Sequence, residues 1–189
     1  MNAVELNSRT YTIVAELDAD VAAREALLDR AMGPGRKRKS SEKIRRGRKP
    51  SEGLALVARG ADGVVVGTVR LWDVAAGETG ALLLGPLAVD PSLKSAGIGS
   101  ALMRHALAEA ARLGHRAVFL VGDAPYYQRF GFSQDKTGDL AMPGPFEKHR
   151  LLGLELSPGA LDGAQGVIRP TGRKAATRPV PARAVAAAA

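Results

Sequence analysis

The hydrophobic pattern in the first half of the chain predicts one helix among strands. Residues 11–17 are β-branched and aromatic enough for a first strand, and residues 21–32 have apolar side chains at helical spacing, with aspartates just before them as N-cap candidates. Residues 53–59 and 64–72 predict two antiparallel strands, because the turn between them is rich in residues that accept positive φ. This half therefore contributes three strands and the first helix.

The pattern of the second half predicts a strand, a helix and another strand. The apolar run 81–89 contains Gly85-Pro86, and because proline has no N–H for a regular ladder, we expect a β-bulge there. Apolar residues at helical spacing then continue to Leu113. Residues 116–121 are continuously apolar, which predicts a strand buried on both faces, and the intervening helix makes it parallel to the run 81–89.

The remaining segments complete a single domain. Residues 125–132 predict a short helix opened by proline and closed by glycine, and residues 149–156 alternate as in a final strand. We expect an α/β fold of the α+β type: one domain over residues 10–162, with a mixed central sheet and flanking helices, after an N-terminal extension of residues 1–9. Residues 163–189 are rich in alanine, proline and arginine without apolar periodicity, so we expect a disordered or loosely attached tail.

The positive charge of the chain is concentrated in two segments. The formal net charge is +8, but residues 33–49 hold nine basic side chains and one acidic one, and residues 163–189 hold five basic side chains and none that is acidic. The first segment belongs to a loop, residues 33–50, inserted between the first helix and the second strand. Its only large apolar residue is Ile44, which we expect to be too little to anchor it in a core. Two interpretations stay open: a mobile solvated loop, or a loop that contacts an acidic acceptor or partner.

The composition excludes several kinds of site. Without cysteine the chain has no disulfide framework, thiolate zinc site or cysteine nucleophile, which fits a reducing compartment. Three histidines give little material for a metal centre, so we expect no metal. No apolar run approaches the roughly 20 residues that span a bilayer, and the N-terminus is polar and acidic, unlike a signal peptide. We therefore expect a cytoplasmic protein without a membrane partner.

A glycine-containing turn between the run 81–89 and the following helix indicates an anion site. Glycines let the backbone approach an anion closely, and the first turn of a helix offers N–H donors at the positive end of the helix dipole. The turn reads Lys94-Ser95-Ala96-Gly97-Ile98-Gly99. It does not fit a dinucleotide-binding turn, because Leu102 stands at the third glycine position. We expect it to bind phosphate; the alternative is that its glycines only satisfy local sterics.

Three features of the chain together indicate a family. The glycine turn is similar to an Arg/Gln-x-x-Gly-x-Gly/Ala motif, with Lys94 in place of arginine or glutamine. Residues 127–132 match a Tyr-x-x-x-Gly-Phe helix, and the order of elements also agrees. On these features the chain resembles the GCN5-related N-acetyltransferase (GNAT) superfamily, in its bacterial branch of predicted N-acetyltransferases, over about residues 10–157. The resemblance implies that the strands ending at Val89 and Val121 splay apart and that coenzyme A (CoA) enters the gap.

The resemblance also implies an acyltransferase that uses acetyl-CoA as its co-substrate and no metal. Backbone groups freed at the bulged strand are expected to pair with the pantetheine arm, and donors of the glycine turn with the pyrophosphate. The cofactor-binding residues expected on this basis are Leu87, Ala88, Val89, Lys94, Ser95, Ala96, Gly97, Ile98, Gly99 and Ser100. The use of longer acyl-CoAs stays open.

By the same resemblance, the reaction is direct transfer of the acetyl group to a primary amine in a ternary complex. Tyr127 matches the family tyrosine near the CoA sulfur, and a phenol can donate a hydrogen bond to the leaving thiolate, so we expect Tyr127 to be the general acid. The alternative for Tyr127 is core packing beside Phe130. The general base is not identified: Asp73 and Glu78 flank the strands that lead to the site, and a water chain to solvent would serve equally.

The acceptor is a small-molecule or protein amine whose identity stays open. If the basic loop lies on the acceptor side of the site, it would favour an acidic acceptor. Two other functions compete with an enzyme. The basic loop and tail could make a non-enzymatic binder of nucleic acid or of an acidic partner, although they lack interleaved aromatic residues and the rest of the domain is slightly acidic. The third function is an acyl-CoA sensor without turnover, against which Tyr127 counts. We expect a monomer or a homodimer.

Overall fold

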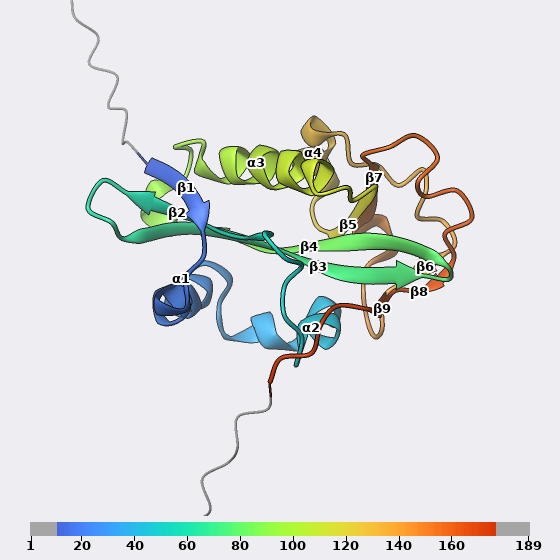
Figure 1. The fold of residues 1–189 in the computed structure, drawn as a ribbon, viewed down its shortest axis with the longest axis horizontal. Helices are drawn as coiled ribbons and strands as arrows, with labels where there is room; N and C mark the ends of the chain where they lie inside the picture. Colours follow the sequence, from blue (N-terminus) through green and yellow to red (C-terminus); the bar gives the residue numbers. More distant parts are fainter. Residues whose placement is uncertain (1–10, 177–189) are drawn as a thin grey trace, which may run out of the picture.

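The structure is a computed structural model that describes residues 11–176 (Figure 1). Its helices are α1 (Val21–Met32), α2 (Ser40–Arg45), α3 (Ile98–Arg112) and α4 (Ala124–Tyr127). The seven strands of the main sheet are β1 (Tyr11–Ala15), β2 (Ala55–Gly60), β3 (Val65–Ala76), β4 (Thr79–Val89), β5 (Ala117–Val121), β7 (Leu151–Glu155) and β9 (Arg169–Pro170). A separate parallel pair consists of β6 (Leu140–Ala141) and β8 (Gly166–Val167). These bounds place every predicted strand and helix of the domain within a few residues of its expected position.

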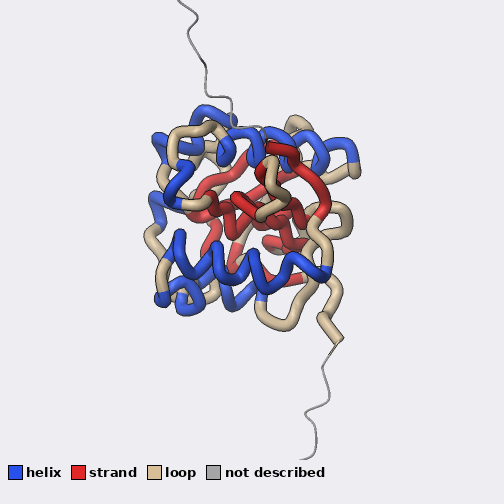
Figure 2. Tube along the Cα trace, turned by 90° about the vertical axis from the view of Figure 1, so that its left-hand side faces the viewer, coloured by secondary structure: helices blue, strands red, loops and turns tan. Residues whose placement is uncertain are grey.

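The sheet lies between two helical layers, so the strands form the middle of the molecule (Figure 2). α3 and α4 lie on one face, and α1 and α2 on the other (Figure 1). None of the helices within residues 11–176 is long and apolar enough to cross a membrane. The arrangement confirms the predicted single domain with a mixed sheet and flanking helices.

The sheet opens at its parallel junction. The order is β1-β2-β3-β4-β5-β7, with β9 on β3, and only the β4–β5 pair in this sheet is parallel. That pair is short: Leu82 faces Val118 and Leu83 faces Phe119, after which β4 and β5 continue without pairing to each other. The predicted splay between these two strands is therefore confirmed.

The predicted β-bulge in β4 is confirmed at Gly85-Pro86. Val69 pairs with Leu87 but Leu71 pairs with Leu84, so β4 has one residue more than β3 between these two pairs. The carbonyl of Gly85 accepts a hydrogen bond of 2.5 Å from the indole nitrogen of Trp72. This bond holds the bulge against the face of the sheet that α1 and α2 cover.

The core has one large cluster on each face of the sheet. The α3 face buries Leu102, Met103, Ala106 and Ala110 of the helix against Val69, Leu71, Leu82, Val118 and Leu120 of the strands. The opposite face buries Ile44, Trp72, Leu83, Phe119, Leu151 and Ile168. Because side chains of a strand alternate between faces, β5 contributes to both clusters, as expected for a strand buried on both sides.

The expectation that Ile44 could not anchor the basic loop is wrong. Residues 34–45 fold into a 3₁₀ turn (Pro34–Arg38) and α2, and Ile44 is 1% exposed against the sheet. The turn is held by Arg36, whose guanidinium group bonds both Glu25 and Asp29 of α1. A single buried isoleucine and these ion pairs are enough to fold the segment, so it is not a mobile solvated loop.

The predicted boundary at residue 162 is also wrong. Ile168 is fully buried, β9 pairs with β3, and a bridge joins Lys174 to Arg48, so the chain stays packed on the domain to the end of the described range. Two-residue strands are too short to leave a periodic signal, which explains the error. The N-terminal extension of residues 1–9 and the remainder of the predicted tail, residues 177–189, lie outside the described residues.

Candidate active site

The glycine turn presents backbone amides without helix partners at the start of α3. Ser95 and Gly97 adopt positive φ values of 70° and 76°, which turn the chain into the helix. The first bond of the helix runs from the Ala101 amide to the Gly97 carbonyl, 3.0 Å, so the amides of residues 98–100 precede it and are available to a ligand. Residues 94–97 are exposed, which leaves the site open to solvent.

Tyr126 lies beside this turn rather than in the cavity described below. A Cβ atom placed on Gly99 would lie 3.2 Å from the Tyr126 hydroxyl and 3.5 Å from Val89 Cγ2. Gly99 therefore allows the first turn of α3, the end of β4 and α4 to approach one another closely. The ring of Tyr126 also packs against Tyr127 at 4.9 Å between ring centroids, with the planes almost perpendicular at 86°.

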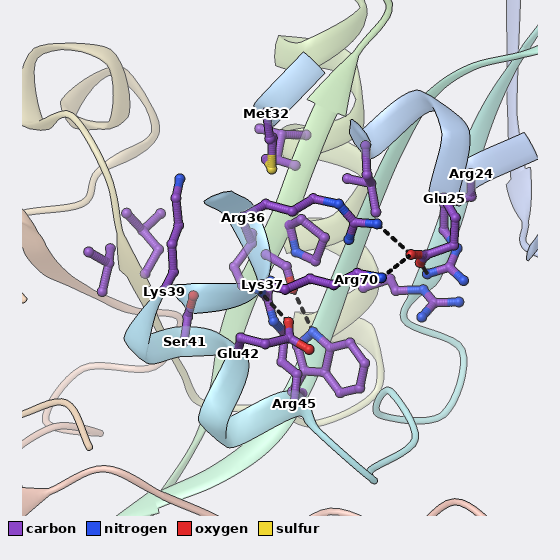
Figure 3. A pocket seen from close by; sticks show the side chains of 18 of the residues that line it. Arg24, Glu25, Met32, Arg36, Lys37, Lys39, Ser41, Glu42, Arg45 and Arg70 are labelled. Atoms are coloured by element: carbon purple, nitrogen blue, oxygen red, sulfur yellow. Dashed lines mark hydrogen bonds and ion pairs between the residues drawn. The ribbon is translucent and has the colours of Figure 1, made fainter. Parts of the chain in front are cut away.

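A cavity of about 340 Å³ lies where β4 and β5 separate (Figure 3). Its sheet side is formed by the bulge and by the ends of the separated strands: Leu84, Gly85, Pro86, Leu87, Leu120 and Val121. Tyr127 lines it from α4. Its other side comes from α1, the 3₁₀ turn, α2 and β3: Arg24, Glu25, Leu28, Met32, Arg36, Lys37, Lys39, Ser41, Glu42, Arg45, Arg70 and Trp72. The cavity thus joins the opening in the sheet to the basic segment.

Tyr127 is a partly buried, neutral phenol at the edge of the cavity. Burial raises the pKa of Tyr127 to about 12, helped by the nearby Tyr126 and Asp123 and opposed by Arg150. Its ring packs directly on Gly122, where an added Cβ atom would come within 2.1 Å of the ring. Its aromatic neighbours are Tyr126 and Phe132, whereas Phe130 packs on Tyr126. Tyr127 is therefore packed in place without losing its access to the cavity.

Three arginines of the cavity are held by carboxylates in one network. Glu16 bonds Arg70 through both of its oxygens and pairs with Arg24 at 3.1 Å. Glu25 pairs with Arg24 at 3.1 Å and with Arg36 at 2.5 Å. Burial would raise the pKa of Glu25, but the hydrogen bond from Arg36 and the positive charges around it hold that pKa below its ordinary value. Glu25 is therefore ionised, and both carboxylates are occupied by arginines.

Arg45 is held much less completely. Its side chain is 10% exposed and pairs with Glu42 at 3.2 Å through one terminal nitrogen. Its Nε atom is buried and has no hydrogen-bond partner among the described residues. Burial, with the positive charges of Arg36 and Arg70, lowers the pKa of Arg45 despite the opposing effect of Glu42. The group is a buried cation with hydrogen-bonding capacity left over.

The structure places neither carboxylate considered as a general base in the cavity. Glu78 lies exposed at the turn between β3 and β4, and Asp73 accepts a hydrogen bond of 2.8 Å from the Ser51 hydroxyl, which also lies 3.3 Å from His115 Nε2. Among the lining residues the carboxylates are Glu25 and Glu42, and both pair with arginine. Among the described residues, the cavity therefore supplies no unpaired carboxylate.

Sequence reasoning did not identify Arg24, Arg45, Arg70 or Trp72 as site residues. Arg70 and Trp72 are two apart in β3 and so face the same side, which is a signal that strand alternation could have supplied. Arg24 and Leu28 are four apart on α1 and share its inner face in the same way. Neither spacing, however, indicates which residues of other elements these side chains contact.

Comparison with known proteins identifies the family. The model of the acetyltransferase (GNAT) family matches residues 21–132, more than half of the chain. The chain is 32% identical over 122 residues to the uncharacterised N-acetyltransferase YhbS of Escherichia coli K12, which covers 61% of this chain and 70% of that protein. The chain therefore belongs to the GNAT family, and its class of enzyme is acyltransferase.

Two solved structures and a shorter match agree with this assignment. The structure of E. coli YhbS in complex with CoA has a TM-score of 0.73 and 28% identity, covering 85% of this chain and 89% of that one. A GNAT family acetyltransferase from Brucella melitensis in complex with acetyl-CoA has a TM-score of 0.65 and 28% identity, covering 85% and 96%. The uncharacterised N-acetyltransferase YjhQ of E. coli K12 is 37% identical over 71 residues, but the match spans only 39% of that protein.

Proposed function

We propose that the protein transfers an acetyl group from acetyl-CoA to a primary amine in a ternary complex. The observation that carries the proposal is the cavity, which is bordered both by Leu87 at the unpaired end of β4 and by Tyr127. A thioester delivered through the opening in the sheet would meet an acceptor that enters from the side of α1 and α2. The two solved relatives in complex with CoA and acetyl-CoA support this choice of co-substrate.

In this proposal, acetyl-CoA binds through backbone groups. The pyrophosphate lies at the glycine turn, with donors from Lys94, Ser95, Ala96, Gly97, Ile98, Gly99 and Ser100. The pantetheine arm lies along Leu87, Ala88 and Val89. At these residues one edge of β4 is hydrogen-bonded to β3, whereas the other edge no longer pairs with β5. The backbone N–H and C=O groups on that second edge are therefore free to bond an extended ligand, as they would bond a further strand.

The chemistry requires a neutral amine and a stabilised leaving group. The amine nitrogen attacks the acetyl carbonyl, a C–N bond forms, and the C–S bond breaks to release CoA. Tyr127 donates a hydrogen bond to the departing sulfur. Complete transfer of the proton from a phenol of pKa about 12 to a thiolate of ordinary pKa about 8.5 is uphill, so Tyr127 acts mainly by stabilising the thiolate in the transition state. The amine proton leaves through water, and solvent supplies the proton that CoA finally gains.

The first test is binding. CoA or acetyl-CoA should raise the melting temperature of the purified protein, because a ligand that binds only the folded state stabilises it. Release of CoA against a panel of primary amines then tests turnover. The absence of any shift at millimolar ligand would remove both the enzyme and the sensor, and a shift without release would favour the sensor. Salt-sensitive binding of nucleic acid without a CoA effect would favour the non-enzymatic alternative. The cytoplasmic location predicted from the sequence is checked by cell fractionation.

A further inference from the structure

We infer that the acceptor is a small primary amine that carries a carboxylate or phosphate group, and that Arg45 binds this anionic group. The inference rests on the proposed function, and it names the substrate class that the cavity selects. It is carried by the charge balance of the cavity, by the incomplete pairing of Arg45 and by the position of Arg45 beside the β-bulge.

The charges that line the cavity do not cancel. Six cationic side chains border it, from α1, the 3₁₀ turn, α2 and β3 (Figure 3): Arg24, Arg36, Lys37, Lys39, Arg45 and Arg70. The carboxylates that pair with them are Glu16, Glu25, Asp29 and Glu42. Two positive charges are therefore in excess among the described residues, and although Lys37 and Lys39 are exposed, this excess attracts an anion to the cavity and repels a polycation.

Among the four arginines, Arg45 has the fewest contacts with carboxylates, although the Nε atom of Arg24 also lacks a hydrogen-bond partner among the described residues. Arg70 is bonded by both oxygens of Glu16, Arg24 lies between Glu16 and Glu25, and Arg36 lies between Glu25 and Asp29. Arg45 has one carboxylate, Glu42, on one terminal nitrogen. Its second terminal nitrogen, Nη1, takes part in no ion pair within residues 11–176 and lies beside the bulge, and a guanidinium group suits a carboxylate or phosphate.

The position of Arg45 links the anionic group to the reaction. A Cβ atom placed on Gly85 would lie 3.7 Å from Arg45 Nη1, so this nitrogen lies against the bulge. The bulge is also the part of β4 next to Leu87, where the proposal places the pantetheine arm. An oxyanion on Arg45 would therefore lie within a small molecule's length of the acetyl group. The volume of about 340 Å³ is at the lower end for ligand pockets, which fits a small acceptor.

The test compares matched amines that differ in their anionic group. Release of CoA is measured for glycine against glycinamide and for O-phosphoethanolamine against ethanolamine, with spermidine as the polycation. We expect the anionic member of at least one pair to have a kcat/KM higher by about tenfold or more. The pair that shows the preference distinguishes carboxylate from phosphate. Turnover of the neutral amines or spermidine equal to or above that of the anionic ones overturns the inference.

The matched variants are Arg45→Gln and Arg112→Gln. Both arginines pair with a glutamate three residues earlier on a helix, but the Arg112 side chain is 66% exposed and that of Arg45 is 10% exposed. Arg45→Gln should raise the KM for the anionic amine by roughly 30-fold and abolish the preference, whereas Arg112→Gln should leave both unchanged. The preference is the ratio of kcat/KM for the anionic amine to kcat/KM for its neutral partner, measured in each variant. When this ratio is compared between variants, the intrinsic reactivities of the two amines cancel. An unchanged preference in Arg45→Gln overturns the role of Arg45.

A binding measurement keeps the inference testable without turnover. Trp72 is the only tryptophan of the chain and lines the cavity, so its fluorescence reports on ligands there. Titration of CoA-bound protein with glycine, O-phosphoethanolamine and inorganic phosphate should give a saturable change, weakened at least about tenfold in Arg45→Gln. No saturable change with any of these anions overturns the inference. Failure of CoA to raise the melting temperature is a separate result, which overturns the proposed function.

Discussion

The glycine turn and the cavity are two regions of residues 11–176 that we propose bind an anion, and they are built in opposite ways. The glycine turn uses backbone amides of consecutive residues at one helix end, and no side chain of the turn is needed to create its positive potential. The cavity uses guanidinium groups of α1, the 3₁₀ turn and α2, which follow one another along the chain, and of the more distant β3 (Figure 3). A backbone site fits any ligand with the same diphosphate, whereas a side-chain site can change with single substitutions.

This difference suits the proposed enzyme, in which the glycine turn binds the co-substrate and the cavity binds the acceptor. The opening in the sheet separates the two regions while Tyr127 stands at the junction. The glycine turn, residues 94–99, lies on the face of the sheet that α3 covers. The basic segment, residues 33–49, lies on the face that α1 and α2 cover. Variants that act on one region and leave the other intact can test the division.

The largest effect is expected at the junction, from Tyr127→Phe. Removing the hydroxyl takes away the proposed hydrogen bond to the leaving sulfur, so kcat should fall roughly 100- to 1,000-fold while the affinity for CoA stays the same. The aromatic contacts with Phe132 and Tyr126 are kept by phenylalanine. Steady-state kinetics and a CoA titration measure the two effects. Unchanged kcat would contradict the assignment of Tyr127.

The pH profile of the wild-type protein sharpens the same assignment. Burial raises the pKa of Tyr127 to about 12, so the phenol stays protonated at neutral and moderately alkaline pH. Turnover should therefore show no decline from ionisation of Tyr127 until the pH approaches about 12. An alkaline decline near pH 10 that disappears in Tyr127→Phe would show that the phenol is far less buried than described.

The next largest effect is expected from Gly97→Val, which acts on the backbone site alone. Gly97 has φ 76°, and a β-branched residue there costs about 1–3 kcal/mol or forces the turn to change shape. Either result displaces the amides, so the affinity for CoA should fall at least about fivefold. Gly63→Val is the matched control: φ is 78°, a Cβ atom would likewise meet nothing within 4 Å, and the residue lies in the turn between β2 and β3. Equal loss of CoA binding in both variants would contradict the backbone site.

A smaller effect concerns the stability of the cavity region. Ile44→Ala removes the buried anchor of α2 and should destabilise the protein by about 2–4 kcal/mol, as measured by denaturant unfolding. Because Arg45 is the next residue, the KM for the acceptor should rise as well, while the KM for acetyl-CoA stays constant. A loss of stability below about 0.5 kcal/mol would show that the segment is as loosely held as the sequence first suggested.

The elements that sequence predicted well are those with a local cause. Proline in β4 removes a ladder donor wherever the strand lies, so the bulge at Gly85-Pro86 followed from two residues. The parallel pairing of β4 and β5 followed from the helix between them. The GNAT resemblance likewise depended on short motifs.

The elements that sequence could not predict depend on distant partners. Ile44 is buried only because Trp72 and β4 lie opposite it, and Ile168 only because β3 leaves an edge free for β9. The counter-ions of the basic segment are Glu25 and Asp29 of α1, so its charge looked unbalanced when read along the chain. For the same reason the cavity, lined by α1, the 3₁₀ turn, α2, β3, β4, β5 and α4, left no motif.

The smallest expected effect is the acid sensitivity of the cavity network, measured with Glu25→Gln. The pKa of Glu25 in the folded protein lies below its ordinary value of 4.5, so its ion pairs add stability above that pH and the contribution is lost as the pH falls through the lower folded value. Replacing Glu25 should lower stability at pH 7 by less than about 1 kcal/mol, because the side chain is partly exposed, and should flatten the decline of stability in acid. Glu52→Gln is the control, since the Glu52 side chain is 87% exposed and reaches only Arg173, at 3.4 Å. Thermal unfolding from neutral pH into this acidic range measures both variants.

CoA binding at pH 7 should be the same in both variants. A weakened affinity in Glu25→Gln alone would contradict the independence of the glycine turn and the cavity.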